Sequence, residues 1–301
     1  MPRDWRFATP LSLSSAPVSL AHVTDPTRGV LYPDRLPTFT RLPPRESAAE
    51  LVSWFWIPQW DLPTGVESRQ PILGYPAANL AVEVDLAAAD GETPTVTSGV
   101  TLWGATTRAS ERVLRGSGWA VGALLRPAAF ARLADSPGDL VDGWVTLGGP
   151  ETGAPESGES TAETLRAAVS EAMPDVDAAV AAASAWLVER VGGPTHEGRL
   201  ANAMADLLMT DAGILRVEDA AERLRVSVRT LQRLAHRSVG LSPAAMIRRR
   251  RLQEAAQRVR DDPDASLAAI AAELGYADQA HLANDFRTVL GLTASEYRSG
   301  V

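Results

Sequence analysis

Two short stretches near the end of this chain carry side chains that suit the edges of nucleic-acid bases. In "SVRTLQRL" (227–234) the polar residues that would point outward from a helix are Arg229, Gln232 and Arg233. In "DQAHLAND" (278–285), which has no Arg or Lys, they are Gln279, His281 and Asn284. Arginine can form two hydrogen bonds with guanine, and glutamine or asparagine can form two with adenine. Whether these side chains act together depends on the elements that carry them.

An internal repeat in the C-terminal part of the chain would position both stretches. Four apolar residues in each copy lie at i, i+3, i+4 and i+7, which is one face of an α-helix. They are Val217, Ala220, Ala221 and Leu224 in the first copy, and Leu267, Ile270, Ala271 and Leu274 in the second. After a tight turn, Ser227 or Asp278 is suited to cap the next helix, and Gly240 or Gly291 to end it. Each copy predicts a helix-turn-helix unit, over 217–240 and 267–291.

One long helix is expected between the two units, over "SPAAMIRRRRLQEAAQRVRDD" (242–262). Ser242 would cap it and Pro243 would take its first position. Its expected buried side consists of Leu252, Ala255, Ala256 and Val259. The run "RRRR" (248–251) spans all sides of a helix, so one or two of these arginines should pack against the units. After the second unit, "TASE" (293–296) is a capping box that opens a final short helix at Tyr297.

Residues 214–298 resemble the DNA-binding domain of AraC/XylS-type bacterial transcription regulators. The segments that carry the resemblance are "LQRLAHRSVGLSP" and "IAAELGYADQAHLANDFRTVLGLTASEYR". The resemblance implies that the second helix of each unit enters a major groove, with half-sites about 10 bp apart on one face of the DNA. The family usually has Phe where this chain has Leu282, and often Arg where it has Asn284. The second change replaces a long cation by an amide suited to adenine.

The resemblance implies two sets of DNA contacts. The six outward side chains named above are the candidates for base contacts. The candidates for phosphate contacts are Ser227, Thr230, Arg237, Arg248, Arg249, Arg250, Arg251 and Arg287. Phosphate contacts position a protein on DNA without reading its sequence. For Arg229, Gln232 and Arg233 the alternative is a phosphate contact or a solvated position. For Ser227 and Thr230 it is helix capping, and for His281 it is local capping with exposure to solvent.

Charge is distributed unevenly along the chain, whose net charge is −8. Residues 226–260 hold nine Arg and one Glu, whereas residues 261–301 hold two Arg and seven acidic residues. A local basic segment is the expected footprint of a polyanion, although a charge run also occurs on solvated helix faces. We therefore expect the half-site of the first unit to dominate binding, and the second to be short, tolerant and adenine-preferring.

The residues before the repeat have a different pattern. Short apolar or alternating runs between 48 and 150 predict a β-rich sandwich or small barrel, cupin-like in kind, with one short helix at "PAAFARLAD" (127–135). Residues 1–45 are predicted to be an irregular entry segment, 148–161 a linker, and 161–173, 175–191 and 196–210 helices. The expected fold class is α+β multidomain. It has a β-rich sensor or dimerisation domain over 1–150, a helical connector over 151–212 and an all-α domain over 213–301.

The β-rich region offers few candidates for an active site. Trp54, Trp56 and Trp103 would suit an effector pocket, with barrel core as their alternative. Glu83 and Asp85 share a strand face and could do acid–base chemistry, with a solvated face as the alternative. The chain has no Cys and no Lys, and its only His before residue 190 is His22. These absences argue against a thiolate nucleophile, a His-rich metal site and a P-loop, so no enzyme, metal or cofactor is expected.

These features together predict a cytoplasmic, sequence-specific transcription regulator. Its expected partners are double-stranded DNA, an unknown small-molecule effector, RNA polymerase and a second copy of the chain held through 161–210. No apolar run reaches about 18 residues, so no membrane span is expected. The alternative is a small-molecule-binding or enzymatic N-terminal module with a degenerate C-terminal domain, which the acidic balance of 261–301 favours.

Overall fold

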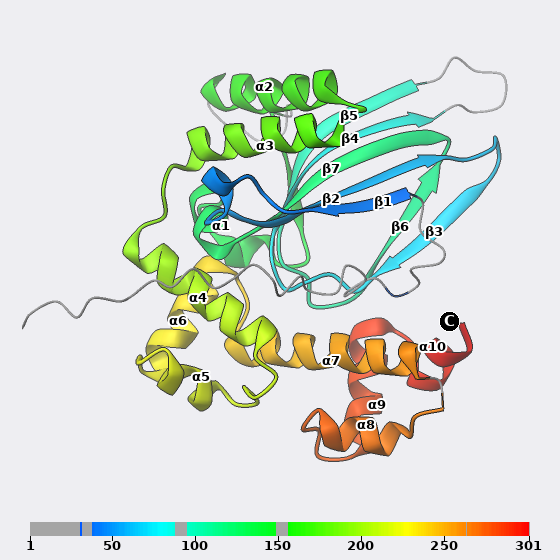
Figure 1. Cartoon of the computed structure of the whole chain (residues 1–301), viewed down its shortest axis with the longest axis vertical. Helices are drawn as coiled ribbons and strands as arrows, with labels where there is room; N and C mark the ends of the chain where they lie inside the picture. Colours follow the sequence, from blue (N-terminus) through cyan, green and yellow to red (C-terminus); the bar gives the residue numbers. More distant parts are fainter. Residues whose placement is uncertain (1–30, 32–37, 88–94, 149–155, 263, 301) are drawn as a thin grey trace, which may run out of the picture.

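The computed structural model describes residues 31, 38–87, 95–148, 156–262 and 264–300. Its N-terminal half contains a six-stranded antiparallel sheet in the order β1-β2-β7-β4-β5-β8 and a two-stranded sheet of β3 and β6 (Figure 1). The strands are β1 (Thr38–Leu42), β2 (Val52–Asp61), β3 (Glu67–Ile72), β4 (Asn79–Ala87), β5 (Thr95–Trp103), β6 (Ser110–Arg115), β7 (Ser117–Leu125) and β8 (Trp144–Leu147). Short helices η2 (Glu46–Ala48), α1 (Pro127–Leu133) and η3 (Pro137–Leu140) lie between strands. The β-rich prediction for this region is confirmed.

Strand β2 shows how alternating side chains build the large sheet. Phe55 and Ile57 are buried on one face, whereas Trp54 and Trp56 lie on the other, because successive strand residues point to opposite sides. Trp56 lies over Gly122 of β7, where any Cβ would come within 2.0 Å of the indole ring. Only glycine therefore fits at position 122.

Helices α2 (Glu156–Ala172) and α3 (Val176–Val191) cover the Phe55 face of the large sheet (Figure 1). Their buried residues Leu165, Val169, Val180 and Leu187 join the core that the strands contribute. The apolar sides of residues 161–191 are thus covered within one chain. The expectation of dimerisation through 161–210 stays a prediction, for which the buried sides of residues 161–191 are not free.

The two-stranded sheet of β3 and β6 reaches the other face of the large sheet. Arg112 of β6 forms two hydrogen bonds with Glu83 of β4, at 2.6 and 2.7 Å. Burial raises the pKa of the neighbouring Asp85 carboxyl. The expectation that these two acids lie on a solvated strand face is therefore wrong, because the β3–β6 sheet shields them.

The remaining helices form the C-terminal part. They are α4 (His196–Thr210), α5 (Val217–Arg223), α6 (Val228–Ser238), α7 (Pro243–Asp261), α8 (Leu267–Glu273), α9 (Gln279–Asp285), the π-helical η4 (Phe286–Leu290) and α10 (Ala294–Gly300). Figure 1 shows α7 running between a unit of α5 and α6 and a unit of α8 and α9. The predicted pair of helix-turn-helix units and the linking helix are confirmed.

Local signals in the sequence account for the ends of these helices. Gly240 and Gly291 have φ angles of 87° and 75°, the left-handed conformation predicted for both. The Ser242 hydroxyl accepts a hydrogen bond from the Ala245 amide at 3.2 Å, as a cap does. The Thr293 hydroxyl accepts from the Glu296 amide at 3.1 Å, which confirms the capping box. Helix α10 itself begins at Ala294, three residues before the predicted start.

The two halves of the molecule share apolar cores. Tyr75 and Leu124 of the β-rich half pack in one core with α4, α5, α6 and the start of α7. Leu31 and Leu73 pack in a second core with α7 and the second unit. Both helix-turn-helix units therefore rest on the β-rich half.

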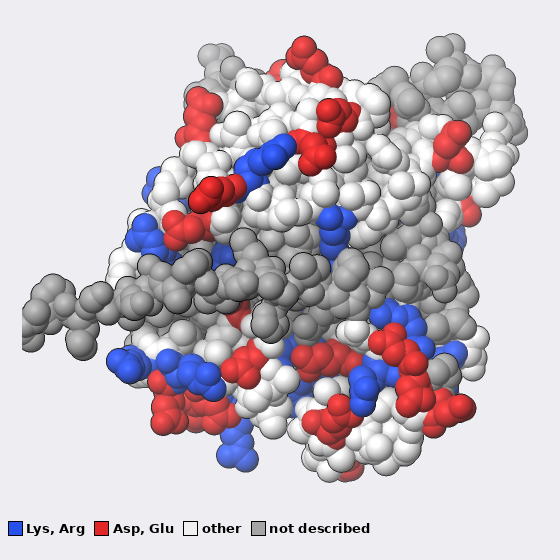
Figure 2. Space-filling model, viewed as in Figure 1, with Lys and Arg blue, Asp and Glu red and all other residues white. Residues whose placement is uncertain are grey.

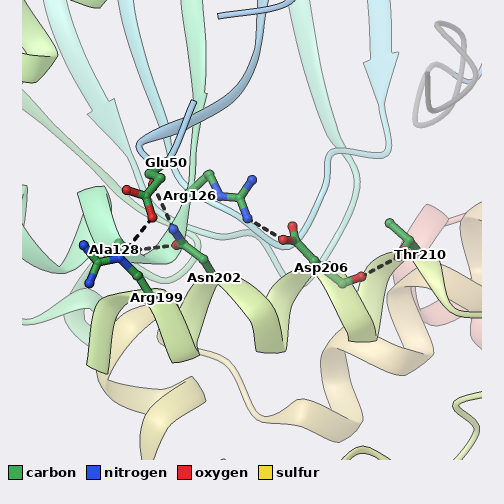
Figure 3. Close-up of polar contacts among 7 residues, drawn as sticks. All are labelled: Glu50, Arg126, Ala128, Arg199, Asn202, Asp206 and Thr210. Atoms are coloured by element: carbon green, nitrogen blue, oxygen red, sulfur yellow. Dashed lines mark hydrogen bonds and ion pairs between the residues drawn. The ribbon is translucent and has the colours of Figure 1, made fainter. Parts of the chain in front are cut away.

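Helix α4 fixes this arrangement with polar contacts (Figure 3). The Asn202 amide accepts a hydrogen bond from the Ala128 amide at 3.0 Å and donates to the Glu50 carbonyl at 2.8 Å. Arg126 pairs with Asp206 one turn further along α4. Since α4 also packs against α6 and α7, the boundary expected at residue 212 stays a prediction.

Three segments differ from the sequence expectations. Strand β1 lies inside the expected irregular segment, while residues 1–30 and 32–37 lie outside the described residues. Helix α2 begins at Glu156, inside the expected linker, of which residues 149–155 are not described. Strand β3, "ESRQPI", was not predicted because it is polar and contains Pro71. Among the described strands it pairs with β6 alone, as suits a proline-containing edge strand.

Candidate nucleic-acid interface

The first unit presents α6 as its outward helix. The Ser227 hydroxyl caps the helix by accepting a hydrogen bond from the Thr230 amide at 3.1 Å, and the two hydroxyls lie 2.8 Å apart. Leu231 and Leu234 are buried against the neighbouring helices. The opposite side of the first two turns therefore faces outward, which is the part of such a helix that contacts base edges.

The three predicted base contacts of this unit lie on that free side. Arg229, Gln232 and Arg233 are all exposed. Within the part of the chain that the structure describes, neither guanidinium has a hydrogen bond or an ion pair. These two cations can meet a base or a phosphate without giving up an existing contact.

The far end of α6 is covered by the β-rich half. A Cβ at Gly240 would lie 2.7 Å from the Pro137 carbonyl oxygen, and His236 lines a groove of about 430 Å³ between α1, α4 and α6. Arg237 pairs with Glu197 at 3.3 Å, with both side chains more than half exposed. An exposed pair of this kind contributes little, so Arg237 can exchange Glu197 for a phosphate.

The second unit presents α9, which continues into η4. Its three predicted base contacts, Gln279, His281 and Asn284, are exposed, while Leu282 is buried. The His281 ring lies edge-on to the buried Tyr276 ring, with centroids 5.1 Å apart. Packing therefore restricts the orientation of His281 more than that of the other two side chains.

Both acids of this helix have structural partners. The Asp278 carboxylate caps α9 by accepting a hydrogen bond from the His281 amide at 2.7 Å. Asp285 points inward, is 1% exposed and accepts a hydrogen bond from Arg248 Nε at 2.8 Å. Helix α9 thus has no arginine of its own, but its Asp285 is hydrogen-bonded to Arg248 of α7.

The run of four arginines on α7 is mostly structural. Arg249 is buried and donates to the carbonyl oxygens of Gly74 at 3.0 Å and Thr106 at 2.8 Å, both in the β-rich half. Burial lowers the pKa of Arg249 to about 10. Arg250 is fully buried and donates to the Ile214 carbonyl at 2.6 Å. Their prediction as phosphate contacts is wrong for this arrangement, because neither guanidinium reaches the surface.

The other two members of the run contact the second unit. Arg248 is half-exposed and hydrogen-bonded to Asp285, which raises the pKa of its guanidinium. Arg251 donates to the Leu274 carbonyl at 2.8 Å and lies 3.9 Å from the centre of the Tyr276 ring. Burial raises the pKa of Tyr276 well above its ordinary range. Of the four arginines, Arg248 keeps the most exposure for contact with a phosphate.

Acidic and basic side chains are mixed over the helical half on the face in Figure 2. This face therefore offers a polyanion no continuous basic surface, and individual exposed cations are the candidates for attracting one. Besides Arg229 and Arg233, Arg287 of η4 is exposed at the second unit. It faces Glu296, whose pKa is lowered mainly by the Thr293 amide hydrogen bond and slightly by Arg287.

The predicted effector residues separate in the structure. Trp54 lies edge-on to Tyr75 and lines a cavity of about 180 Å³ bordered by α1, α4 and the junction of α6 and α7. Trp56 instead donates to Asn79 Oδ1 at 2.9 Å. Trp103 pairs with Trp144, at a ring separation of 5.7 Å. The three indoles therefore do not line one pocket.

Two properties of the described residues bear on other classes of function. Among them, no three His, Asp or Glu side chains come together as a metal site would require. None of their helices combines the length and the apolar character needed to cross a membrane.

One exposed residue at this interface was missed from the sequence. Arg225 lies in the turn before α6, has a φ angle of 55° and is aligned by the repeat with Gly275. The signal was present in the repeat, because a helix end that needs a left-handed residue has glycine in one copy and arginine in the other.

Comparison with known proteins agrees with this division of the chain. Residues 220–300 match the family model of a helix-turn-helix domain, and residues 40–143 match that of a domain of unknown function, DUF6597. An uncharacterized HTH-type transcriptional regulator of Haemophilus influenzae is 31% identical over 106 residues, 35% of each chain. The HTH-type transcriptional activator RhaS of Escherichia fergusonii is 33% identical over 109 residues, 36% of this chain and 39% of that protein.

These curated relatives are matched over less than two fifths of their own length. Among solved structures, ToxT of Vibrio cholerae aligns with 81% of this chain and 98% of its own, at 12% identity and a TM-score of 0.41. The C-terminal domain of AraT, a response regulator from Geobacillus stearothermophilus, aligns with 36% of this chain and 89% of its own, at 21% identity and a TM-score of 0.33. The two family matches cover separate parts of the chain, residues 40–143 and 220–300, and neither extends over half of it.

Proposed function

We propose that this chain is a sequence-specific DNA-binding transcription regulator that places α6 and α9 in two successive major grooves. The observation that carries the proposal is the set of exposed side chains at the start of the capped helix α6. Arg229 and Arg233 have no partner among the described residues, and Gln232 lies between them. The match of residues 220–300 to a helix-turn-helix domain supports the same assignment.

In this proposal, the two units contact DNA in different ways. Arg229 and Arg233 would bond guanine or phosphate, and Gln232 would bond adenine. In the second unit, Gln279, His281 and Asn284 would contact bases without adding a cation of their own. Phosphate contacts would come from Ser227, Thr230, Arg237, Arg248 and Arg287. The linking helix α7 would hold the two helices about one DNA turn apart.

Selection from a pool of random duplexes tests the proposal directly. The full chain is incubated with the pool at low salt, and bound duplexes are recovered, sequenced and footprinted. We expect a defined site of two half-sites whose centres lie about 10 bp apart. Binding without any sequence preference would reject the proposal and would favour an N-terminal binding module with a degenerate helix-turn-helix domain.

Regulation by a small molecule is part of the proposal, and the structure offers one cavity for it. The cavity beside Trp54 has a volume of about 180 Å³ and a mainly apolar lining that includes Met209, Val239 and Met246. A cavity of about 150 Å³ can hold benzene. An apolar ligand there would contact the end of α6 and the start of α7, where it could change the position of the first unit.

Benzene and toluene are suitable probes of this cavity. Binding should raise the thermal midpoint of the full chain, and Ala205→Leu, which fills the cavity, should remove that rise. If either probe changes the affinity for a selected duplex only in the wild type, the cavity communicates with the DNA-binding helices. Equal responses of wild type and variant would place the probe elsewhere.

The proposal also includes the remaining partners. A regulator of this type would act on promoter DNA in the cytoplasm and could contact RNA polymerase there. A second copy of the chain would need a surface other than residues 161–191, whose apolar sides are buried against the sheet. For an enzymatic role, the described residues offer no candidate beyond the Glu83, Asp85 and Arg112 cluster, which is held by its own ion pair.

A further inference from the structure

The turns of the two helix-turn-helix units have the same backbone hydrogen bonds. In the first, the Arg225 amide donates to the Glu222 carbonyl and the Val226 amide to the Ala221 carbonyl, both at 3.0 Å. In the second, the Gly275 and Tyr276 amides donate to the matching carbonyls at 3.2 and 2.9 Å. This is the Schellman motif, whose key residue is left-handed and is usually glycine.

The first unit has arginine at this left-handed position. Arg225 has a φ angle of 55°, whereas Gly275 has 72°. A residue with a Cβ is disfavoured in that conformation, and such residues cluster at functional sites. The glycine of the second unit suits this conformation, and a Cβ at Gly275 would also come within 2.9 Å of the Leu215 side chain. Nothing in the described contacts of Arg225 explains the arginine of the first.

The Arg225 side chain makes no compensating contact within the protein. It is exposed, and no described residue forms a hydrogen bond or an ion pair with its guanidinium. Two other arginines of the C-terminal part do have partners: Arg223 pairs with Asp211 at 3.5 Å, and Arg258 with Glu273 at 2.8 Å. The free energy lost in the strained turn is therefore not recovered in the free protein.

The position of Arg225 indicates which contact could offset the free energy lost in the strained turn. The residue lies two positions before Ser227, the cap of α6. In a helix-turn-helix on DNA the first helix crosses the backbone and the second enters the groove, so the turn between them lies close to phosphates. We propose that Arg225 is a phosphate contact of the first unit, kept in a strained turn for its charge. This inference rests on the proposed DNA-binding function.

Salt dependence of binding to a random-sequence duplex of about 30 bp tests the inference, because a phosphate contact needs no particular sequence. Each phosphate contact contributes about 0.9 to the slope of log affinity against log salt. Arg225→Gly and Arg225→Asn both suit a left-handed turn and remove the charge, whereas Arg225→Lys keeps it. The first two should lose about 0.9 of slope and the third should keep it. Between about 50 and 200 mM salt, the advantage of the wild type over Arg225→Gly should shrink about 3.5-fold.

Thermal unfolding separates a DNA contact from a folding effect. Arg225→Gly should unfold at the same temperature as the wild type or higher, because the substitution relieves the strained turn. Arg190→Gln is the matched control for charge. Arg190 is exposed on α3, and this helix packs on the sheet, outside the helix-turn-helix units (Figure 1). It should leave the slope unchanged.

Two outcomes would overturn the inference in different ways. If the wild type binds the duplex with a clear salt dependence and all three Arg225 variants match its slope, Arg225 touches no phosphate, while the proposed function stands. If the wild type itself shows no salt-dependent binding, both the inference and the proposed function fail.

Discussion

The two helix-turn-helix units share a fold and differ in where their charges go. Three positions of the first unit carry cations without a partner among the described residues, and the matching positions of the second unit are neutral. They are Arg225, Arg229 and Arg233 in the first, and Gly275, Ala280 and Asn284 in the second. The second unit has instead an inward carboxylate, Asp285, at the position of the apolar Leu234. The same backbone can thus supply electrostatic attraction in one unit and mainly hydrogen-bonding side chains in the other.

The largest expected effect comes from removing the partner of the buried carboxylate, Asp285. Arg248→Ala should lower the free energy of unfolding by about 3 kcal/mol, the low end for a broken buried pair since Arg248 is half-exposed, because Asp285 would lose its hydrogen-bonded cation while remaining buried. Asp285→Leu, which copies the first unit, should cost clearly less, since the half-exposed Arg248 can return to water. Urea unfolding of both variants measures the two values. If both variants lost the same free energy of unfolding, the cost of leaving the buried carboxylate without a cation would not be the reason for the loss.

Base contact by the first unit is expected to have the next largest effect. Arg229→Ala should weaken binding at a selected site by about 1–3 kcal/mol and relax the preference at one base pair. Ala280→Arg, the reverse change at the matching position of α9, should strengthen binding to any duplex. Affinities measured for a panel of single-base variants distinguish the two roles of Arg229. A uniform loss over the panel would show that it contacts only phosphate.

Asn284 allows a test of the base preference of the second unit. Asn284→Arg supplies the cation that Arg233 has in the first unit, and arginine prefers guanine where asparagine prefers adenine. We expect a shift of preference in the second half-site worth about 1 kcal/mol. Repeating the duplex selection with this variant shows the shift. An unchanged second half-site would remove Asn284 from the base contacts.

Substitution of the two helix caps, Ser227 and Asp278, is expected to have the smallest effect. Ser227→Ala and Asp278→Ala should each lower the free energy of unfolding by about 1 kcal/mol, because each leaves a helix-end amide without its acceptor. Only Asp278→Ala also removes a negative charge next to the DNA-facing helix, so it alone should strengthen binding to a random duplex. If both variants changed DNA affinity equally, the cap and not the charge would be responsible.

The C-terminal part was predictable because its signals are local. Helix faces at i, i+3, i+4 and i+7, caps at Ser227 and Asp278, and left-handed glycines at 240 and 291 each depend on residues a few positions away. The repeat doubled these signals, since each copy supports the interpretation of the other. The alternation along β2 placed Phe55 and Trp54 on opposite faces for the same reason.

Contacts between distant segments could not be predicted in this way. The Arg249 guanidinium is held by the carbonyl oxygens of Gly74 and Thr106, and every residue carries such an acceptor. The sequence could show that four consecutive arginines must diverge around a helix, but not which of them would be buried. Likewise, Glu83 becomes shielded only because β6 places Arg112 above it. Both outcomes depend on how the β-rich half packs, for which no local pattern exists.

The first unit is expected to supply most of the affinity for DNA. Once a site has been selected, the measurement is the affinity of the full chain for three duplexes: the intact site and the same site with one or the other half scrambled. Unequal losses, with the larger on scrambling the half-site contacted by α6, are the predicted result. Equal losses, or a larger loss on scrambling the half-site of α9, would contradict the claim.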